Sequence, residues 1–494
     1  MRRMRVFAAV STLALTAACT VGPDYVKPTT PAAEAYKEAP PVAAADAGIW
    51  NPAAPADQAG KGKWWEAYND PTLNALEEQV SVANQSLKIA EARFRQARAL
   101  IGVSRAAEFP SLTTLPGIAS INTSDNKPYP STSHTTGDFI LPLDASYEVD
   151  LWGRIGRNVN AAGDEAQASA ADLQTADLSL HAELAVDYFD LRSADSQKKL
   201  LDDSVTAFAD ALQLTTNRAN GGAAPDSDVA QAKTQLDTTR VQATDITVLR
   251  AQFEHAIAVL IGKSPSNFSL AAAPLALRQP SIPVGLPSDL LQRRPDIAAA
   301  ERRVAEANEQ IGIATAAYYP SLLLSPVAGF EGHNAGDWFN WPSLFWSVGF
   351  TMGQTLFDGG RRDALSDAAR ASYDANVANY RQVTLTAFQQ VEDDLAALRI
   401  LQQEAQQQDE AVASAQNSLQ LFTNRYVGGR DTYLQVITAQ TIALGNERNQ
   451  TEILRRRMEA SVQLIKALGG GWDTGTLPSL KALEKSAGAA PSSL

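Results

Sequence analysis

The most constraining feature of this 494-residue chain is Arg361 to Val427, a stretch of 67 residues without glycine or proline. Such a stretch favours one uninterrupted α-helix, which at 1.5 Å per residue is about 100 Å long. Its apolar residues recur at alternating steps of three and four, the spacing of a coiled-coil seam, as at Val412, Ala415, Leu419 and Phe422. Because ordinary domains are much shorter, the sequence predicts an elongated, mainly helical molecule.

The chain also contains one unit twice. Thr216-Asn217-Arg218 followed by Gly221-Gly222 recurs 207 residues later as Thr423-Asn424-Arg425 followed by Gly428-Gly429. Phe109-Pro110-Ser111-Leu112 returns as Tyr319-Pro320-Ser321-Leu322. Such collinear matches indicate a duplication. We expect each unit, residues 64–262 and 288–470, to contain a helix, two strands, a very long helix, a tight turn and a returning helix. Residues 263–287 link the units, and the Ala/Ser/Gly/Pro-rich end of the tail at 471–494 is predicted to be disordered.

Four segments of about ten residues alternate between apolar and small or polar side chains, as strands with two different faces do. They are residues 112–122, 139–150, 322–331 and 343–357. Strands of this length cross a bilayer when tilted, whereas the soluble alternative is a half-buried sheet lying on its own helices. In the last segment we expect one face to contact lipid, with the side chains of Leu344, Trp346, Val348, Phe350 and Met352.

Four strands cannot close a barrel, and an open strand edge in lipid would leave backbone groups unpaired. The barrel would therefore be shared between subunits, with 8, 12 or 16 strands for two, three or four copies. The strand arithmetic leaves the number of copies open. No segment after the N-terminus approaches 18 consecutive apolar residues, so any membrane crossing is expected to use strands.

The N-terminus is typical of a bacterial export signal. Arg2, Arg3 and Arg5 precede a short apolar run, Val6 to Ala17, and residues 1–18 are predicted to be a signal peptide. Cys19 follows small residues and is the only cysteine, as at a lipoprotein cleavage site. We expect Cys19 to be lipidated and residues 19–63 to begin a lipid-anchored mature chain. An ordinary cleavage site or a free thiol are the alternatives.

Nothing in the sequence indicates catalysis. The four histidines are scattered without metal-ligand spacing, and no nucleophile, redox or nucleotide-binding motif occurs in its proper context. Arg293-Arg294 beside Pro295 and Asp296 is expected to form structural ion pairs at a helix start. The formal net charge of −13 disfavours nucleic acid as a partner. We therefore expect no enzyme, no metal and no cofactor other than a covalent lipid on Cys19.

Several short segments, in this order, resemble the TolC-type outer membrane factors, in particular the lipoprotein branch that serves resistance-nodulation-division efflux pumps. The segments are Cys19-Thr20-Val21-Gly22-Pro23-Asp24-Tyr25, Trp64-Trp65, Leu290-Leu291-Gln292-Arg293-Arg294-Pro295-Asp296-Ile297, Tyr319-Pro320-Ser321-Leu322 and Leu356-Phe357-Asp358-Gly359-Gly360-Arg361.

The resemblance implies a fold that is mainly α with a β membrane part. Each chain would contribute coiled-coil hairpins to a long α-helical barrel, and four strands to a 12-stranded transmembrane β-barrel shared by a homotrimer. Asp226 to Ile261 and Trp65 to Phe109 would stack end to end beside one long helix, and Asp431 to Leu468 and Pro295 to Tyr318 beside the other. The leftover segments would form a belt around the middle of the tunnel.

The resemblance also implies a function. The protein would lie in the outer membrane of a Gram-negative bacterium, anchored by its lipid, and extend into the periplasm. It would contact a periplasmic adaptor and an inner-membrane pump of the resistance-nodulation-division type. It would be the passive conduit of a tripartite efflux pump for drugs or other small toxic compounds. Two alternatives remain at this stage, a type I protein secretion channel and a lipid-anchored coiled-coil scaffold without a pore.

The resemblance further implies a gate at the periplasmic tips of the long helices. Asp431 would line it, with Asp226 and Asp228 nearby, and Arg430 and Arg425 would offer ion pairs that restrain opening. Three-fold symmetry would turn each aspartate into a ring of carboxylates that favours cations. The alternative is that Asp431 and Asp226 only cap the returning helices.

Overall fold

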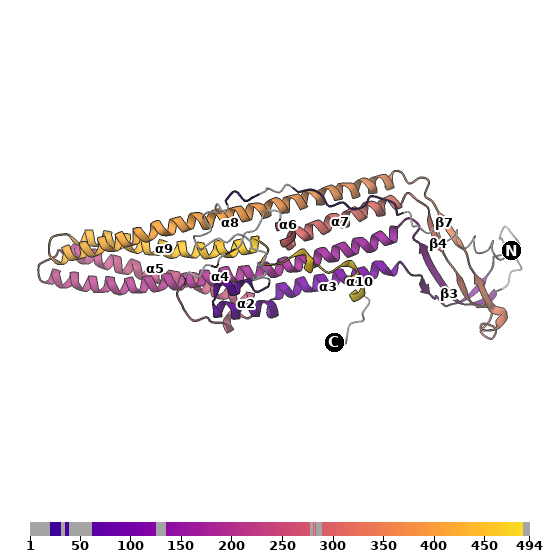
Figure 1. Cartoon of the computed structure of the whole chain (residues 1–494). Helices are drawn as coiled ribbons and strands as arrows, with labels where there is room; N and C mark the ends of the chain where they lie inside the picture. The colour runs from indigo at the N-terminus through magenta and orange to yellow at the C-terminus, as the bar shows by residue number, and fades with distance from the viewer. Residues whose placement is uncertain are drawn as a thin grey trace.

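The computed structural model describes residues 20–30, 35–38, 62–124, 135–276, 280, 282 and 289–487. The molecule is a long rod of nearly parallel helices with a small β-sheet at one end, set at an angle to the helices (Figure 1). The predicted fold class, long helices with a small β part, is confirmed for the chain. Cys19 and residues 1–18 lie outside the described residues.

Two helices of 67 residues run along most of the rod, α4 (Arg154–Asn220) and α8 (Arg361–Val427). The helix predicted at Arg361 to Val427 is confirmed. The first unit has its own stretch without glycine or proline, from Asp164 to Asn220. Helix α4 begins ten residues before this stretch and includes Gly156 and Gly163. Of the predicted seam, Val412 and Ala415 are buried and Leu419 is partly buried against neighbouring helices.

The helices of the two units match in length. Helices α5 (Asp226–Leu260) and α9 (Tyr433–Ala467) each have 35 residues, and α3 (Gln85–Ala106) and α7 (Pro295–Ala316) each have 22. A shift of 207 residues maps α4 onto α8 and α5 onto α9, and a shift of 210 maps α3 onto α7. Helices α5 and α9 occupy the tip half of the rod and α3 and α7 the sheet half (Figure 1).

Glycines with positive φ stand at the same places in both units. Gly153 and Gly360, at φ 75° and 85°, let the chain turn from the sheet into the long helix. Gly222 and Gly429, at φ 72° and 70°, form the turns at the helix tips. A residue with a Cβ atom is strained in this conformation, which explains why the repeat keeps glycine there.

The helix expected from Trp65 to Phe109 is wrong as a single element. The chain forms a 3₁₀ turn η3 (Trp64–Tyr68), α2 (Pro71–Ala83) and α3. The Asp70 carboxylate caps α2 by accepting from the backbone N–H of Thr72 and Leu73. The Asn84 side chain then accepts from Leu87 N–H and donates to the carbonyl of Leu260 at 2.8 Å, which bends the chain between α2 and α3.

The four predicted strands appear, but three of them are interrupted. Strand β3 (Thr135–Val149) is continuous, whereas the others form β1 (Ser111–Thr113) and β2 (Gly117–Asn122), β4 (Ser321–Leu324) and β5 (Val327–Gly332), and β6 (Leu344–Ser347) and β7 (Phe350–Gly353). Pro116 and Pro326 lie in the first two interruptions, since proline has no N–H to donate, and Gly349 lies in the third. The strand expected at 343–357 ends at Gly353.

The pairing register is unchanged across each interruption. Ser111 faces Ser146 and Gly117 faces Ile140, so β1 and β2 pair with β3 in one antiparallel register. In the same way, β4 and β5 share one register with β3, and β6 and β7 share one register with β5 and β4. The sheet is therefore a four-stranded antiparallel meander in chain order. Among the described residues, the outer edges of β1/β2 and of β6/β7 have no strand partner.

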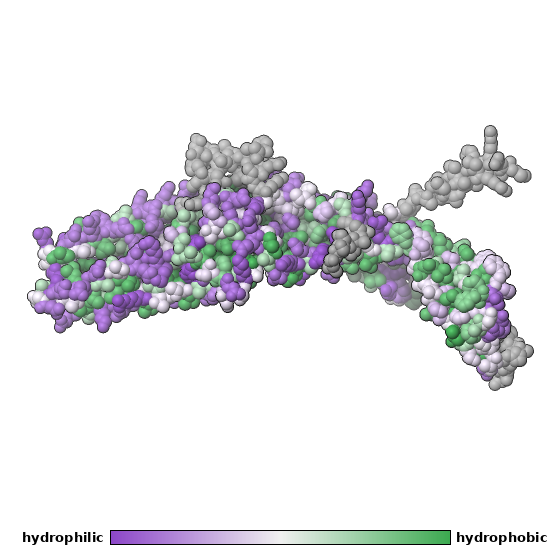
Figure 2. Space-filling view, turned by 90° about the horizontal axis from the view of Figure 1, so that it is seen from below, coloured by the Kyte–Doolittle hydropathy of each residue, from purple (hydrophilic) through white to green (hydrophobic). Residues whose placement is uncertain are grey.

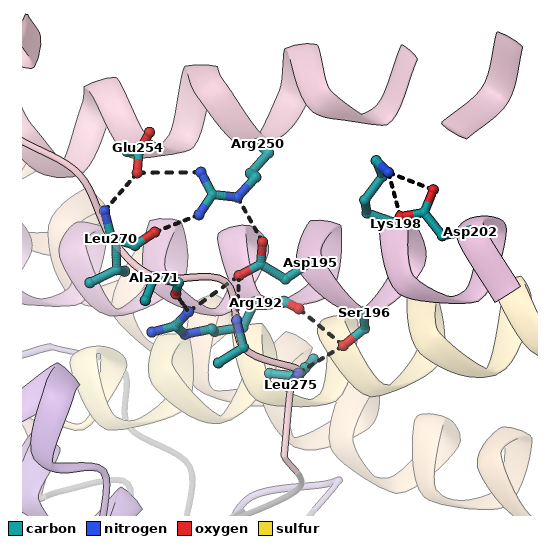
Figure 3. A network of polar contacts seen from close by, with 11 residues as sticks. Arg192, Asp195, Ser196, Lys198, Asp202, Arg250, Glu254, Leu270, Ala271 and Leu275 are labelled. Carbon is teal, nitrogen blue, oxygen red and sulfur yellow. Dashed lines mark hydrogen bonds and ion pairs between the residues drawn. The ribbon is translucent and has the colours of Figure 1, made fainter. Parts of the chain in front are cut away.

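The middle of the rod holds the segment that links the two units. After α5, residues 263–276, with the 3₁₀ turn η4 (Pro265–Asn267), run back along α4 and α5 (Figure 3). Arg250 donates to the Asp195 carboxylate at 2.7 Å and to the Leu270 carbonyl at 2.6 Å. Arg192 donates to the Ala271 carbonyl at 2.7 Å. The linker is thus held by hydrogen bonds to its backbone and by its apolar side chains Phe268, Leu270 and Leu275, which pack against the core.

The second unit opens with α6 (Leu290–Arg293). The Arg294 guanidinium pairs with Asp296 at 2.7 Å and donates to the last carbonyl of α9, that of Ala467, at 3.0 Å. The structural ion pair predicted at this helix start is confirmed for Arg294.

The disorder predicted for the end of the tail is wrong for part of it. The tail forms a 3₁₀ turn η7 (Thr474–Thr476) and helix α10 (Leu480–Ala487). Leu483 is 2% exposed and packs against Ile101 of α3 and Ala166 of α4. Composition missed this contact, because a short segment is ordered by docking into a groove that only the packed helices create.

Candidate functional sites at the two ends of the rod

The sequence predicts an apolar face for residues 139–150 and another for residues 343–357. The sheet brings these two faces together on one of its sides. Leu141 of β3 faces Phe330 of β5, which faces Leu344 of β6. At the other end of the sheet, Tyr147 faces Leu324, which faces Phe350. Directly opposed residues in a sheet point to the same side. The apolar residues of 139–150 and 343–357 therefore form one continuous apolar face.

Most of this face is open to the surroundings. The expected lipid-facing residues Trp346, Val348, Phe350 and Met352 are between 62% and 74% exposed, whereas Leu344 is half-buried. Figure 2 shows hydrophobic residues gathered at the sheet end of the molecule. An exposed apolar surface of this extent on one side of a sheet marks an interaction surface rather than a solvated one.

The other side of the sheet carries charged, polar and small residues among apolar ones. Glu148 opposes Leu323, which opposes Thr351, and Asp144 opposes Val327, which opposes Ser347. The guanidinium of Arg154, at the start of α4, forms two hydrogen bonds with the Glu148 carboxylate, at 3.1 and 2.6 Å. The sheet thus has one side suited to lipid and one suited to water.

The junction between sheet and helices receives the N-terminal segment. The Trp152 indole N–H donates to the Pro320 carbonyl at 2.7 Å, and its ring lies 4.7 Å from that of Tyr319. The Trp152 carbonyl accepts from Val21 N–H at 3.2 Å. Thr20 lies against Gly153, closely enough that a Cβ atom on Gly153 would contact the Thr20 methyl group. The residue after Cys19 therefore lies at the sheet–helix junction.

The tip end of the rod contains the five predicted gate residues. The Arg425 guanidinium pairs with both oxygens of the Asp431 carboxylate, at 2.6 and 3.1 Å. Arg430 lies exposed in the turn, and no described side chain forms an ion pair with it. Asp226 is exposed at the first turn of α5, whereas Asp228 is buried within the tip. The structure thus brings only Arg425 and Asp431 together.

Neither Asp431 nor Asp226 caps its returning helix through a side-chain hydrogen bond, although Asp226 lies in the first turn of α5, where a negative charge favours the helix start. Helix α9 begins at Tyr433 after Thr432, and α5 begins at Asp226 after Pro225, and neither start has a side-chain cap hydrogen bond. The Asp431 carboxylate is instead engaged by Arg425. Its side chain is 15% exposed, against 59% for Arg425.

A further tip residue, Arg218, was missed by sequence reasoning. Its guanidinium donates to the carbonyls of Tyr426 and Val427, at 2.9 and 3.0 Å, and lies 4.6 Å from the centre of the Tyr426 ring. It thereby ties the tip of α4 to the C-terminal end of α8. The repeat contained a signal for it, since Arg218 and Arg425 occupy equivalent positions of the two units.

The described residues contain no group of three or more His, Cys, Asp or Glu arranged to hold a metal ion. His255 and His333 are exposed, and His134 lies outside the described residues. His181 is buried, and its Nδ1 lies 2.6 Å from a carboxylate oxygen of Glu77, which joins α4 to α2. Among the described helices, none is both long and apolar enough to cross a bilayer.

Comparison with known proteins agrees with this architecture. The model of the family described as "Outer membrane efflux protein" matches residues 76–263 and 286–470. The toluene efflux pump outer membrane protein TtgF of Pseudomonas putida is 31% identical over 464 residues, which cover 92% of this chain and 94% of that protein. The pyoverdine export outer membrane protein OpmQ of Pseudomonas aeruginosa is 31% identical over 421 residues, 83% of this chain and 88% of that protein.

Solved structures share the fold. The outer-membrane channel OprN is 30% identical with a TM-score of 0.84, covering 92% of this chain and 100% of that chain. The open-state MtrE outer membrane channel of Neisseria gonorrhoeae is 26% identical with a TM-score of 0.79, covering 92% and 99%. Because the family model matches most of both units and the fold is that of these channels, the chain belongs to the outer membrane efflux protein family.

Proposed function

We propose that the chain is the outer-membrane channel of a tripartite efflux pump. The observation that carries this proposal is the sheet, at the end of helices about 100 Å long. One of its sides is apolar, the other carries the charged and polar residues, and its two edges have no strand partner among the described residues. The sheet is suited to a wall between lipid and a water-filled lumen. The helices are long enough to continue that lumen as a tunnel into the periplasm.

Three copies are the assembly that we propose. An unpaired strand edge in lipid costs several kcal/mol per backbone group, so the β6/β7 edge of one copy would pair with the β1/β2 edge of the next. Three copies give a closed barrel of 12 strands. The strand arithmetic would also allow two or four, and the choice of three follows from the family resemblance.

We further propose that the channel is passive and serves small toxic compounds. Curated relatives are named for the efflux of toluene, solvents and antibiotics, and one for the export of pyoverdine. These relatives are outer-membrane components of pumps, so energy would come from partners. We propose a periplasmic adaptor at the tips and an inner-membrane pump of the resistance-nodulation-division type.

A covalent lipid on Cys19 is part of the proposal. The position of Thr20 at the sheet–helix junction supports it, because an acyl chain attached one residue earlier would lie near the membrane surface on the periplasmic side. Cys19→Ser should abolish incorporation of labelled palmitate. Label retained in this variant would rule out a lipid on Cys19. We expect the variant to keep partial function, because the strands also insert into the membrane.

The tips are the proposed gate. In support, the Arg425–Asp431 pair closes the turn between α8 and α9, and Arg218 ties α4 to α8 beside it. Around a three-fold axis, Asp431 of each copy would form a ring of carboxylates at the narrowest point. Opening would require the tips to separate, so these polar links would restrain it.

The decisive experiment removes the gene and measures sensitivity to antibiotics, dyes, metals and organic solvents, with and without the parent chain supplied in trans. We expect raised sensitivity to several small compounds, restored by the parent chain, and an unchanged set of secreted proteins. A loss of secreted protein with unchanged sensitivity would indicate type I secretion instead. Purified protein that forms no detergent-stable trimer would favour the scaffold without a pore.

A further inference from the structure

The loop between β5 and β6, residues 333–343, is built on a frame of hydrogen bonds between its polar groups. The Asn334 side-chain carbonyl accepts from the N–H groups of Gly336 and Asp337, at 2.9 and 3.0 Å. The Asp337 carboxylate accepts from the amides of Asn334 and Asn340, at 2.8 and 3.2 Å, and its backbone carbonyl accepts from the Ser343 hydroxyl at 2.6 Å. These hydrogen bonds all lie within the loop.

The same loop carries aromatic side chains that fold onto the sheet. Trp338 and Phe339 stack with ring centres 4.8 Å apart. Trp338 lies 5.5 Å from Phe139 of β3, and Phe339 lies 5.9 Å from Phe330 of β5. Register places Phe139 and Phe330 on the apolar side of the sheet. The loop therefore extends the apolar face beyond the ends of the strands.

The outermost aromatic rings of the loop remain uncovered. Phe339 is 61% exposed and Trp341 is 82% exposed, although the polar residues of the loop bond to one another. This end of the sheet lies farthest from the helices (Figure 1). At the opposite limit of the apolar face, Trp152 and Tyr319 form a second aromatic pair. The apolar face is thus bounded by aromatic residues at both of its ends.

Tryptophan prefers the boundary between lipid headgroups and acyl chains, where its ring contacts apolar groups and its N–H remains near water. We propose that residues 333–343 bind lipid on the extracellular side. Trp338 and Phe339 complete the lipid-contacting face, and Trp341 inserts at the headgroup boundary of the outer leaflet. This inference rests on the membrane insertion in the proposed function. Lipid is the occupant because the aromatic cluster is continuous with the face formed by Trp346, Val348 and Phe350.

The loop has a physical consequence for the assembly. Trp341 lies between Asn340 and Ser343, and both of these residues bond to Asp337 in the frame. The loop would then fix the depth of the sheet in the bilayer from the outside, as the Trp152–Tyr319 pair would from the periplasmic side.

The test uses cysteines introduced one at a time into the full-length channel, labelled with an environment-sensitive fluorophore and reconstituted into phosphatidylcholine vesicles. The vesicles contain lipids with a nitroxide quencher either at the headgroup or deep in the acyl chain. Trp341→Cys is the test position, with Phe339→Cys as a second. Val348→Cys on the apolar side and Thr351→Cys on the polar side are the matched controls. The parent chain, whose single cysteine is Cys19, measures background labelling.

We expect the label at position 341 to lose more fluorescence with the headgroup quencher than with the deep quencher, and the label at 348 to show the opposite order. The label at 351 should be little affected. If 348 is quenched and both 341 and 339 are not, the loop lies in water or against another copy, and the lipid-binding inference is overturned while the membrane channel stands. If no position is quenched, membrane insertion itself has failed.

Discussion

Arg218 and Arg425 occupy equivalent positions in the two units, yet they make different contacts. Arg218 binds the end of α8, whereas Arg425 pairs with Asp431 in its own turn. The residue equivalent to Asp431 in the first unit is Ala224, which cannot form such a pair. The two units therefore differ in their contacts at the tips, and the change from Ala224 to Asp431 accounts for the ion pair of the second unit.

Replacing Arg425 and Asp431 in separate variants distinguishes the effect of losing the ion pair from the effect of losing the carboxylate. Arg425→Gln should raise conductance in planar bilayers and keep the cation preference, because the proposed carboxylate ring remains while its link is lost. Asp431→Asn should raise conductance and lower the cation preference. Arg430→Gln is the matched control, since Arg430 has no ion-pair partner among the described residues, and it should change conductance less. Equal effects of all three would place the gate elsewhere.

His181 is the most enclosed titratable base among the described residues. It is 2% exposed, its ring stacks 4.3 Å from that of Trp65, and it contacts Glu77, Ser81 and Asp177. Burial lowers its pKa, but hydrogen bonds and charges of Asp177 and Glu77 outweigh this and raise the pKa to about 9. Burial raises the pKa of Glu77 to about 7, against the opposing effect of His181. Both groups therefore bind protons more tightly in the folded state.

Stability should accordingly fall as pH rises. The contribution of His181 is fully present below its ordinary pKa of 6.5 and is lost as pH passes about 9, and Glu77 acts in the same direction at lower pH. The unfolding temperature should drop between pH 6.5 and about pH 9. His181→Gln should make this drop smaller and should lower the unfolding temperature at pH 6.5. His255→Gln, at an exposed histidine, should leave the profile unchanged. A parent-like profile in His181→Gln would assign the pH dependence to other groups.

At the scale of elements, the strands carry the prediction about membrane insertion. Val348 lies in the interruption between β6 and β7, and alternation with Trp346 and Phe350 places it on the apolar side, whereas Thr351 is on the other side. An arginine at the bilayer midplane on the lipid side costs about 2–4 kcal/mol per copy, whereas a lumen position tolerates it. Val348→Arg should therefore reduce the yield of trimer on native gels much more than Thr351→Arg. Similar yields for the two variants would mean that the strand does not contact lipid.

Helix α10 behaves as a strap across the sheet half of the rod. Leu480 lies against Gly163, where a Cβ atom would come within 2.0 Å of the leucine methyl group, and Leu483 fills a groove between α3 and α4. The Gln167 amide donates to the Pro478 carbonyl at 3.0 Å. Small residues on α4 thus create the site that orders the tail.

This docking predicts a local effect of mutation. Leu483→Asp places a charge in an apolar groove and should release α10, which faster hydrogen exchange in residues 480–487 and in the facing part of α3 would report. The rest of the chain should stay folded, because α10 contributes little to the main core. Lys481→Asp on the exposed side of the same helix is the control. Unchanged exchange in Leu483→Asp would show that α10 is not held by this contact.

In the part of the chain that the structure describes, the sheet has two edges without a strand partner. Strands β2 and β7 lie at opposite edges of the meander, so they cannot meet within one chain, yet an assembly in a membrane requires both edges to be paired. Pairing of one edge with the opposite edge of the next copy is heterologous and closes into a ring. The bend between sheet and helices is repeated in every copy of such a ring.

Cysteine pairs between the two edges test this closure. One cysteine scanned through 117–122 and another through 350–353 should form disulfides in at least one antiparallel register. Oxidation in membranes should then yield linked species of two and three copies. Pairs with one cysteine in β3 and the other in β5 should link only within one chain, which makes them the control for oxidation. Products larger than three copies would contradict the trimer, and absence of products between copies would contradict edge pairing.

Much of the architecture is determined by residues that are close together in the sequence. The absence of glycine and proline over 67 residues determines a helix that long, because nothing in the backbone interrupts its hydrogen bonds. Alternation along residues 139–150 and 343–357 determines that each strand has an apolar side. Positive-φ glycines determine where the chain turns, since the conformation of a tight turn depends on the residues within it. These features could be predicted from the sequence alone.

Other features exist only once distant segments meet. Whether the two apolar strand faces lie on the same side depends on the register of β3 with β5, and the binding of α10 depends on a groove between α3 and α4. The Arg218 contact with Tyr426 joins residues about two hundred positions apart, and the His181–Glu77 pair joins residues about one hundred apart. Sequence periodicity reports the spacing along one element and not the partner across a gap. Tertiary structure therefore decided the sidedness of the sheet, the tip contacts and the order of the tail.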